Sequence, residues 1–237
     1  MATIASQVIL HPTVSQSLKF SSTTLGRDKV LEVLQGEKEA AVRWNALKTH
    51  LATARKLLRL GKPLEHLQAA LKASLASGPV GEQITAIARQ ISYFGYLSFD
   101  ALVWINTVKF YSFSSETSTK VAKFAYRFWL AGITLSIING TLKSVRLAKE
   151  ERKLKHSKSW GGETDAGREA EQETRLSAIL ASRDNTRHQL VIDLLDIWIP
   201  ATALGISNMN DGALGIFGLI SSLMAGQKHW QSVNGKK

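Results

Sequence analysis

The chain has 237 residues, with 30 Lys and Arg against 19 Asp and Glu, a formal net charge of +11 and no cysteine. This length allows one or two domains, and the lack of cysteine excludes a disulfide framework and thiolate chemistry. The basic balance favours an anionic partner, either nucleic acid or a membrane surface. The six histidines lack the spacing to other ligands that a metal site requires.

The N-terminal segment, residues 1–22, is polar and β-branched and contains Pro12. It lacks the basic start and long apolar run of a secretory signal, so we expect an extended lead or a weak helix. A short helix is predicted from about Asp28 to Leu34.

Residues 43–77 are predicted to form a basic amphipathic helix that is interrupted once. Its apolar residues recur at spacings of three and four, which places them on one stripe of a helix. The Gly61-Lys62-Pro63 step interrupts it, because proline lacks the N–H and disfavours helix just before it, and a second breaker cluster follows at 77–81. The stripe predicted to enter a membrane consists of Trp44, Leu47, Leu51, Ala54, Leu57, Leu58, Leu60, Leu64, Leu67 and Leu71.

Cations flank this stripe, and no acid occurs between Arg43 and Lys62. A helix with an apolar face and a basic flank is typical of membrane-surface helices, where each cation near anionic headgroups contributes about 1 kcal/mol. The predicted headgroup-binding residues are Arg43, Lys48, Arg55, Lys56, Arg59 and Lys62. The alternative is an ordinary surface helix that packs its leucines on a protein core and leaves its lysines in water.

Four apolar runs follow, at residues 91–113, 124–142, 190–207 and 212–227. The first is long enough, at about 34 Å as a helix, to cross a hydrocarbon core of about 30 Å. Asp100, Asp193 and Asp196 count against membrane spans, because a charge near mid-bilayer is costly. Small residues spaced four apart favour spans, since they allow close helix packing in lipid: Gly132, Ser136, Gly140, Gly218, Ser222 and Gly226.

Charge placement also favours the membrane. If all four runs cross, 26 of the 30 Lys and Arg residues lie on one side of the bilayer. The positive-inside rule makes that side cytosolic, with both termini there, and a two-span arrangement gives the same orientation.

We therefore predict an all-α protein, in which amphipathic N-terminal helices precede a helical membrane-embedded bundle with two to four transmembrane helices. The predicted division is a cytosolic amphipathic region (1–90), a hydrophobic helical pair (91–142), a charged and partly disordered cytosolic loop (143–189), and a hydrophobic helical hairpin with a short basic tail (190–237). Serines of the basic stretch 153–167 are candidates for phosphorylation, which would weaken attraction to anionic lipid. The alternative is an inert linker.

Several short motifs give the chain a family resemblance. They are Thr23 to Lys29, Arg55 to Ala70 with its RKxxRxGKP element, Gly95-Tyr-Leu, Arg127-Phe-Trp129, and Asp193-Leu-Leu-Asp196 running on to Trp230. With these motifs the chain resembles the peroxisomal membrane biogenesis factors of the peroxin-eleven family, in its fungal form. One departure is Gln35-Gly36-Glu37, where that family has an aromatic and a basic residue.

The resemblance implies an integral peroxisomal membrane protein that elongates the organelle membrane before fission, through an amphipathic helix and self-association. It also implies partners in the fission machinery, including a dynamin-related GTPase, and no cofactor. The alternative function is a channel for small metabolites, lined by Asp100, Asn106 and Asn139. Neither an enzyme nor a nucleic-acid binder is expected, because the sequence has no P-loop, nucleophile elbow or zinc spacing.

Overall fold

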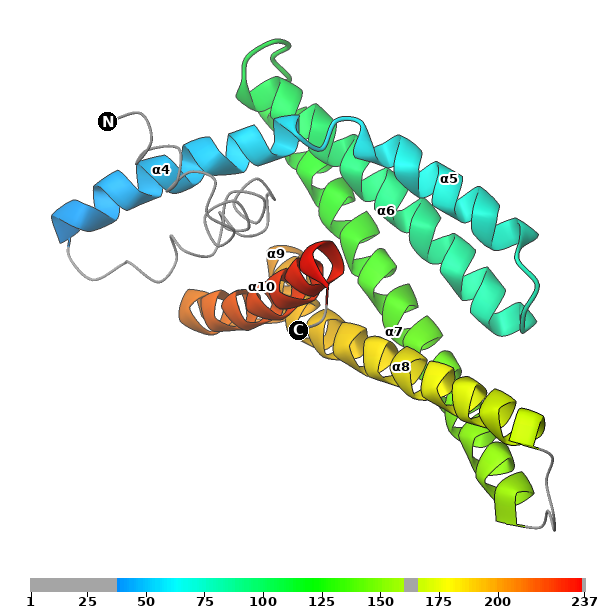
Figure 1. Ribbon diagram of the computed structural model, residues 1–237. Coiled ribbons are helices and arrows are strands. Elements are labelled where there is room, and N and C mark those ends of the chain that lie inside the picture. The colour runs from blue at the N-terminus through cyan, green and yellow to red at the C-terminus, as the bar shows by residue number, and fades with distance from the viewer. Residues whose placement is uncertain (1–37, 160–165, 236–237) are drawn as a thin grey trace, which may run out of the picture.

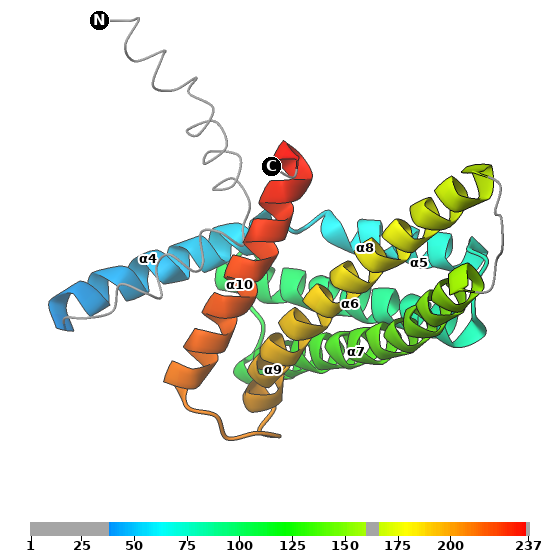
Figure 2. The same cartoon turned by 60° about the horizontal axis from the view of Figure 1, so that its bottom comes forward.

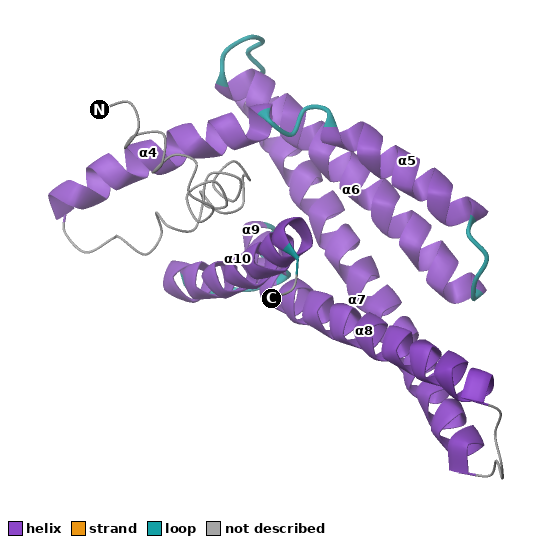
Figure 3. Ribbon diagram, viewed as in Figure 1, coloured by secondary structure: helices purple, strands orange, loops and turns teal. Residues whose placement is uncertain are grey.

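The computed structural model describes residues 38–159 and 166–235, and every regular element in these ranges is a helix (Figures 1 and 3). The helices are α4 (Lys38–Leu57), α5 (Lys62–Leu75), α6 (Val80–Thr107), α7 (Ser115–Ser159), α8 (Ala166–Asp196), α9 (Trp198–Ala203) and α10 (Asp211–Asn234). The predicted all-α class is confirmed. The helix predicted over 28–34 and the departure at 35–37 lie outside the described residues.

The helices α5, α6 and α7 run side by side, and each is antiparallel to the next (Figure 1). The helix α8 packs against α7, and α10 packs across the C-terminal half of α8 (Figures 1 and 2). The helix α4 contacts α6 near one end of this layer and then projects away from it. The amphipathic stretch is thus divided between a projecting helix and an edge helix.

Glycine and proline end the first helices where the sequence predicts. The helix α4 ends at Leu57, and α5 begins at Lys62 with Pro63 in its first turn, where a missing N–H costs nothing. Pro79 in extended conformation is the N-cap of α6. Both predicted interruptions are confirmed.

The first apolar run ends earlier than predicted. The helix α6 stops at Thr107, and residues 108–113 form the turn to α7. The Asn106 side chain accepts a hydrogen bond from the Phe113 backbone N–H at 2.9 Å and donates one to the Ser118 hydroxyl at 3.1 Å. Lys109 adopts a φ of 58°, which redirects the chain. A side-chain cap therefore ends the helix within an apolar sequence.

The prediction of a loop over residues 143–189 is wrong for most of that range, because residues 143–159 continue α7 and residues 166–189 belong to α8. Pairs at a spacing of four support these helices, as in Arg146–Glu150 at 2.8 Å. Glu151 pairs with both Lys155 and Arg183, which joins α7 to α8. Residues 160–165, within the stretch predicted to be disordered, lie outside the described residues.

The last two apolar runs occupy the C-terminal helices. The third run is divided, because α8 ends at Asp196 and Pro200 lies in the first turn of the short helix α9. The fourth run lies within α10, whose N-cap Asn210 accepts a hydrogen bond from the Ala213 backbone N–H at 2.7 Å.

A close helix approach fixes the register of α6 against α7. A Cβ atom on Gly95 would lie 2.6 Å from a ring carbon of Phe128. The Phe128 ring is itself stacked on Phe99, with ring centroids 5.6 Å apart. The ring therefore has little room to move, and only glycine fits at position 95.

Replacing Gly95 with valine should lower the free energy of unfolding by about 2 kcal/mol or more, because overpacking a fixed contact costs about 1–3 kcal/mol. The measurement is thermal unfolding of the full chain in detergent, followed by circular dichroism. Gly215→Val in α10 is the matched control, since nothing lies within 4 Å of a Cβ built there. Equal losses in the two variants would contradict the contact.

Candidate membrane-contacting surface and polar interior

The leucines of α5 form an apolar stripe that the described chain leaves uncovered. Leu64, Leu67, Leu71 and Leu75 are 66%, 41%, 63% and 79% exposed. On the opposite side of α5, His66 forms a hydrogen bond with Gln90 of α6, and Ala70 is buried. The other predicted membrane-inserting residues lie nearby: Leu47, Ala54, Leu57, Leu58 and Leu60 are exposed, whereas Trp44 and Leu51 are half-buried.

The exposed apolar surface extends beyond the predicted residues. Val80, Ile84 and Ile91 of α6 are exposed, as are Leu142 and Val145 of α7. A Cβ on Gly81 would lie 3.5 Å from Leu142, so the stripes of α6 and α7 adjoin. Ile91 and Leu142 are end residues of two predicted apolar runs, whereas Val80, Ile84 and Val145 lie outside the runs. None of the five was predicted to belong to the membrane-inserting face.

The six predicted headgroup-binding cations divide into two groups. Those exposed to solvent are Arg43, Lys48 and Lys62. Those half-buried, which line a central cavity of the helix bundle, are Arg55, Lys56 and Arg59. The structure therefore leaves the first group available for lipid, and directs the second toward the protein interior.

Lys56 forms an ion pair with Asp100, with the Lys56 Nζ atom 2.7 Å from the carboxylate. The two side chains are 23% and 11% exposed. The pair joins α4 to α6 and explains the carboxylate within an apolar run. A buried carboxylate needs such a partner, because an unpaired charge away from water is costly.

Neutralising one partner of this pair should destabilise the chain more than neutralising both. We expect Asp100→Asn to cost about 1–3 kcal/mol, because Lys56 loses its acceptor, and Lys56→Gln in the same chain to recover part of that loss. Unfolding of the single and double variants in detergent measures the coupling. The exposed pair Lys120–Glu116 is the control and should show a coupling below about 0.5 kcal/mol. Strictly additive losses at positions 56 and 100 would refute the pairing.

A second polar contact lies between α7 and α8. The Ser136 hydroxyl donates to the buried Asp193 carboxylate at 2.5 Å, and the Gln189 amide donates to its other oxygen at 2.9 Å. At the N-terminal end of α6, the Arg146 guanidinium donates hydrogen bonds to both Glu82 carboxylate oxygens, at 2.6 and 3.0 Å. The helices of the bundle are thus joined through polar groups.

Within the described residues the interior is partly polar and much of the exterior is apolar. Eight polar or charged residues are buried beside seven Ala, Leu and Ile residues and two prolines, and many large apolar side chains are exposed. A soluble domain buries mainly apolar residues. Buried, mutually paired polar groups behind an apolar surface are typical of helix bundles surrounded by lipid.

Within the described part of the chain, α7 alone is long and apolar enough to cross a membrane, with a mean hydropathy of 1.3 over an 18-residue window of which 28% is buried.

The residues considered for a channel are engaged in joining helices. Asn139 donates to the Glu82 carbonyl at 2.7 Å and to the Thr85 hydroxyl at 2.8 Å. Asn106 caps the end of α6, and Asp100 binds Lys56. Asp100 and Asn139 line two different cavities, and Asn106 lines neither of them.

The small residues predicted to pack helices lie in contacts within one chain. Gly132 and Ser136 of α7 are buried against α6 and α8. A Cβ on Gly140 would lie 2.7 Å from Leu190 of α8. In α10 the buried residues of the set are Gly218, Ser222 and Gly226. Packing between two copies through these residues stays a prediction.

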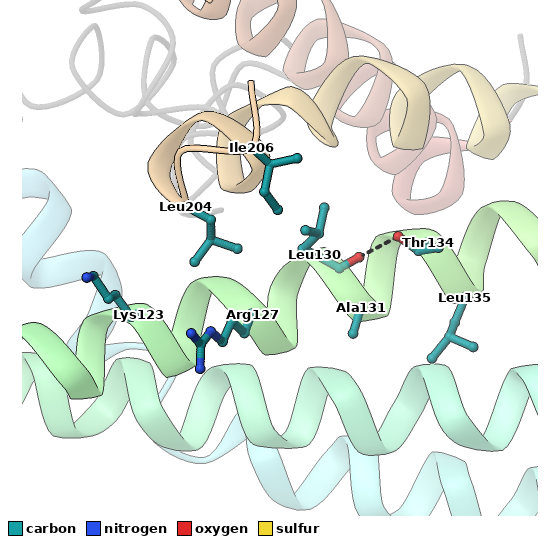
Figure 4. Close-up of a pocket in the computed structure, with 8 residues that line it drawn as sticks. All are labelled: Lys123, Arg127, Leu130, Ala131, Thr134, Leu135, Leu204 and Ile206. Carbon is teal, nitrogen blue, oxygen red and sulfur yellow. Dashed lines mark hydrogen bonds between the residues drawn. The ribbon is translucent and has the colours of Figure 1, made fainter. Parts of the chain in front are cut away.

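A surface groove of about 600 Å³ lies on the outward side of α7 (Figure 4). Leu130 points toward Leu204 and Ile206 from the segment after α9, and Lys123 and Arg127 lie at one end. In the described ranges, no three His, Asp or Glu side chains come together in a way that could hold a metal ion.

Comparisons with known proteins identify the family. The family model of Peroxisomal biogenesis factor 11 matches residues 14–230. The chain is 26% identical to peroxisomal membrane protein PMP27 of Saccharomyces cerevisiae, over 97% of this chain and 99% of that protein. It is 26% identical to peroxisomal membrane protein PMP30B of Candida boidinii, over 95% and 97%, and 24% identical to peroxisomal membrane protein 11A of Homo sapiens, over 86% and 92%. No solved structure matches the chain. With its family resemblance confirmed over nearly its whole length, the chain belongs to the peroxisomal biogenesis factor 11 family, and its function is in peroxisome biogenesis.

Proposed function

We propose that the chain elongates the peroxisomal membrane by inserting the leucine stripe of α5 and of the α4–α5 junction into one leaflet. A helix sunk about 5–10 Å into one leaflet widens that leaflet relative to the other. Many such helices held close together favour a tubule over a flat membrane. The action is mechanical and needs no catalytic residue.

The observation that carries this proposal is the uncovered stripe of α5. Leu64, Leu71 and Leu75 are each more than 60% exposed, although burying one leucine is worth about 1.5–3 kcal/mol. The described chain gives them no partner, and a lipid acyl region would. The adjoining exposed residues of α6 and α7 enlarge the same apolar surface.

The remaining parts of the proposal concern topology and partners. We place α7 across the membrane along residues 124–142, with both termini and the basic segments on the cytosolic side, as the positive-inside rule favours. Anionic lipids would bind the outward cations Arg43, Lys48 and Lys62. Self-association and cooperation with a dynamin-related GTPase in fission follow from the family resemblance.

The full chain reconstituted into liposomes provides the test. Liposomes with an anionic lipid fraction should form tubules visible by electron microscopy as the protein density rises, and the same protein in planar bilayers should give no metabolite or ion conductance. Conductance without a change in liposome shape would replace the proposal with the channel alternative, which the comparisons do not support.

A further inference from the structure

The groove on the outward side of α7 is apolar along most of its length and basic at one end (Figure 4). Its apolar lining comes from α7 and from the segment after α9: Leu130, Ala131, Leu135, Leu204 and Ile206. Thr134, which also lines it, donates its hydroxyl to the Leu130 carbonyl at 2.9 Å. The cations at the basic end are Lys123 and Arg127. The insertion of the α5 leucines uses none of these side chains.

The two cations have no carboxylate partner within the described part of the chain. The ion pairs found there include neither Lys123 nor Arg127, and both side chains are exposed. Arg127 lies over the Phe124 ring, 5.6 Å from its centroid, and this contact supplies no anion. The carboxylate of Asp100, in another apolar run, is by contrast paired with Lys56. The basic end of the groove therefore lacks the negative charge that would balance it.

Arg127 is the only charged residue of the run 124–142, which we place across the membrane. It lies about 5 Å along the helix from the end of that run. A charge inside the hydrocarbon core is costly unless it is paired or reaches the interface, and a long arginine side chain near a helix end can extend to the headgroups. Lys123, one turn earlier on the same side of α7, lies at the interface itself. The two cations therefore meet at the level of the lipid phosphates.

The length of the groove matches one leaflet of a bilayer. From Lys123 to Leu135 the helix rises about 18 Å, and one leaflet supplies half of a hydrocarbon core about 30 Å thick. An acyl chain whose phosphate lies beside Lys123 would therefore follow the groove to near the middle of the bilayer. Ile206 in the opposite wall is 69% exposed, so the described chain leaves this wall uncovered.

We propose that this groove binds an anionic phospholipid of the bilayer, with its phosphate on Lys123 and Arg127 and one acyl chain between α7 and the segment after α9. A guanidinium binds phosphate through two parallel hydrogen bonds, and an ammonium adds a second positive charge. Basic pockets beside membrane-spanning helices bind anionic headgroups in this way. The lining has two cations and no carboxylate, which favours a net-negative lipid over a zwitterionic one.

The proposal rests on the placement of α7 across the membrane, and it does not require the α5 leucines to insert. Lipid binding in detergent and tubulation of liposomes can therefore fail independently. If lipid binds the groove while liposomes keep their shape, the fault lies with membrane insertion. If liposomes form tubules while the groove binds no lipid, the fault lies with the assignment of the groove.

The test is native mass spectrometry of the full chain in an uncharged maltoside detergent, titrated with phosphatidylglycerol or with phosphatidylcholine that has the same acyl chains. We expect one phosphatidylglycerol molecule to be retained about tenfold more tightly than phosphatidylcholine. Glycerol phosphate carries the phosphate without acyl chains and should bind far more weakly, because it leaves the apolar part of the groove empty. Equal retention of the two lipids, or glycerol phosphate binding as tightly as phosphatidylglycerol, would overturn the proposal.

Replacing both Lys123 and Arg127 with glutamine should abolish most of the preference for phosphatidylglycerol, because it removes both positive charges of the groove. The matched control replaces Lys149 and Arg152 with glutamine. These are also one lysine and one arginine exposed on α7, but they lie outside the groove, and the preference should remain. A preference that survives the change at positions 123 and 127 would refute the assignment.

Further variants separate the groove from other lipid contacts. Ala131→Phe places a ring in the groove at an exposed position and should weaken retention of phosphatidylglycerol, whereas Ala181→Phe, exposed on α8 outside the groove, should not. Replacing Arg43, Lys48 and Lys62 with glutamine should leave the tightly held lipid in place. Loss of that lipid in this last variant, with retention in Ala131→Phe, would assign it to α4 and α5 and overturn the proposal.

Discussion

Replacing Leu64, Leu67 and Leu71 with aspartate should abolish the tubulation of liposomes by the full chain and leave its helical fold intact. The three side chains are exposed, so their replacement removes little packing within the described chain. Each loses about 1.5–3 kcal/mol of transfer free energy into the acyl region. Binding through α5 should therefore fall by a factor of at least one thousand. Electron microscopy of the reconstituted liposomes, with circular dichroism for the fold, is the measurement.

A charge-matched control comes from the polar side of the same helix. Gln68→Asp with Lys72→Asp alters the net charge by the same amount as the three leucine replacements, at two exposed positions. This variant should still form tubules. If it loses tubulation as completely as the leucine variant, charge accounts for the effect and the leucine stripe does not insert.

In the reconstituted chain, replacing Arg43, Lys48 and Lys62 with glutamine should weaken the attachment of α4 and α5 to an anionic liposome surface by roughly a hundredfold at low salt. These three cations are exposed, and each contributes about 1 kcal/mol near an anionic surface. Binding to neutral liposomes should not change, and the difference should shrink as salt rises. The protein density at which the reconstituted liposomes form tubules, followed by electron microscopy at several salt concentrations, measures both effects.

The control for this variant removes three cations from the far end of α7. Lys149, Arg152 and Lys153 are also exposed, and their replacement with glutamine changes the net charge equally. We expect this variant to form tubules from anionic liposomes almost as the unchanged chain does. Equal weakening in both variants would show that total charge, rather than the position of the cations on α4 and α5, determines the attachment.

Local signals made the helix boundaries predictable where glycine and proline set them. Pro63 and Pro79 mark the starts of α5 and α6 as predicted, because their effect on the backbone acts over neighbouring residues. The end of α6 was missed because it depends on the Asn106 side chain reaching Phe113. The hydropathy of residues 91–113 does not reveal that hydrogen bond, so it could not predict where the helix ends.

The site was predictable only in part for a similar reason. The leucine stripe of α5 follows from spacing alone, and the structure leaves it exposed as an inserting face requires. The inward direction of Lys56 could not be derived from spacing, because it depends on Asp100 from another helix. One sequence signal could have revealed the Lys56–Asp100 pair. A basic helix and an isolated acid within an apolar run of the same chain can be expected to pair.

The far half of α7 also has an electrostatic consequence. The helix has 45 residues and is about 67 Å long, so if residues 124–142 fill the hydrocarbon core, residues 143–159 extend about 25 Å beyond it. At physiological salt the potential of a charged surface decays over about 8 Å. A charge added at the far end of α7 would therefore change the attraction of the protein for anionic lipid only slightly, and phosphorylation within residues 153–167 stays a prediction. At that distance the lipid surface exerts almost no electrostatic force on the charges at the outer ends of α7 and α8.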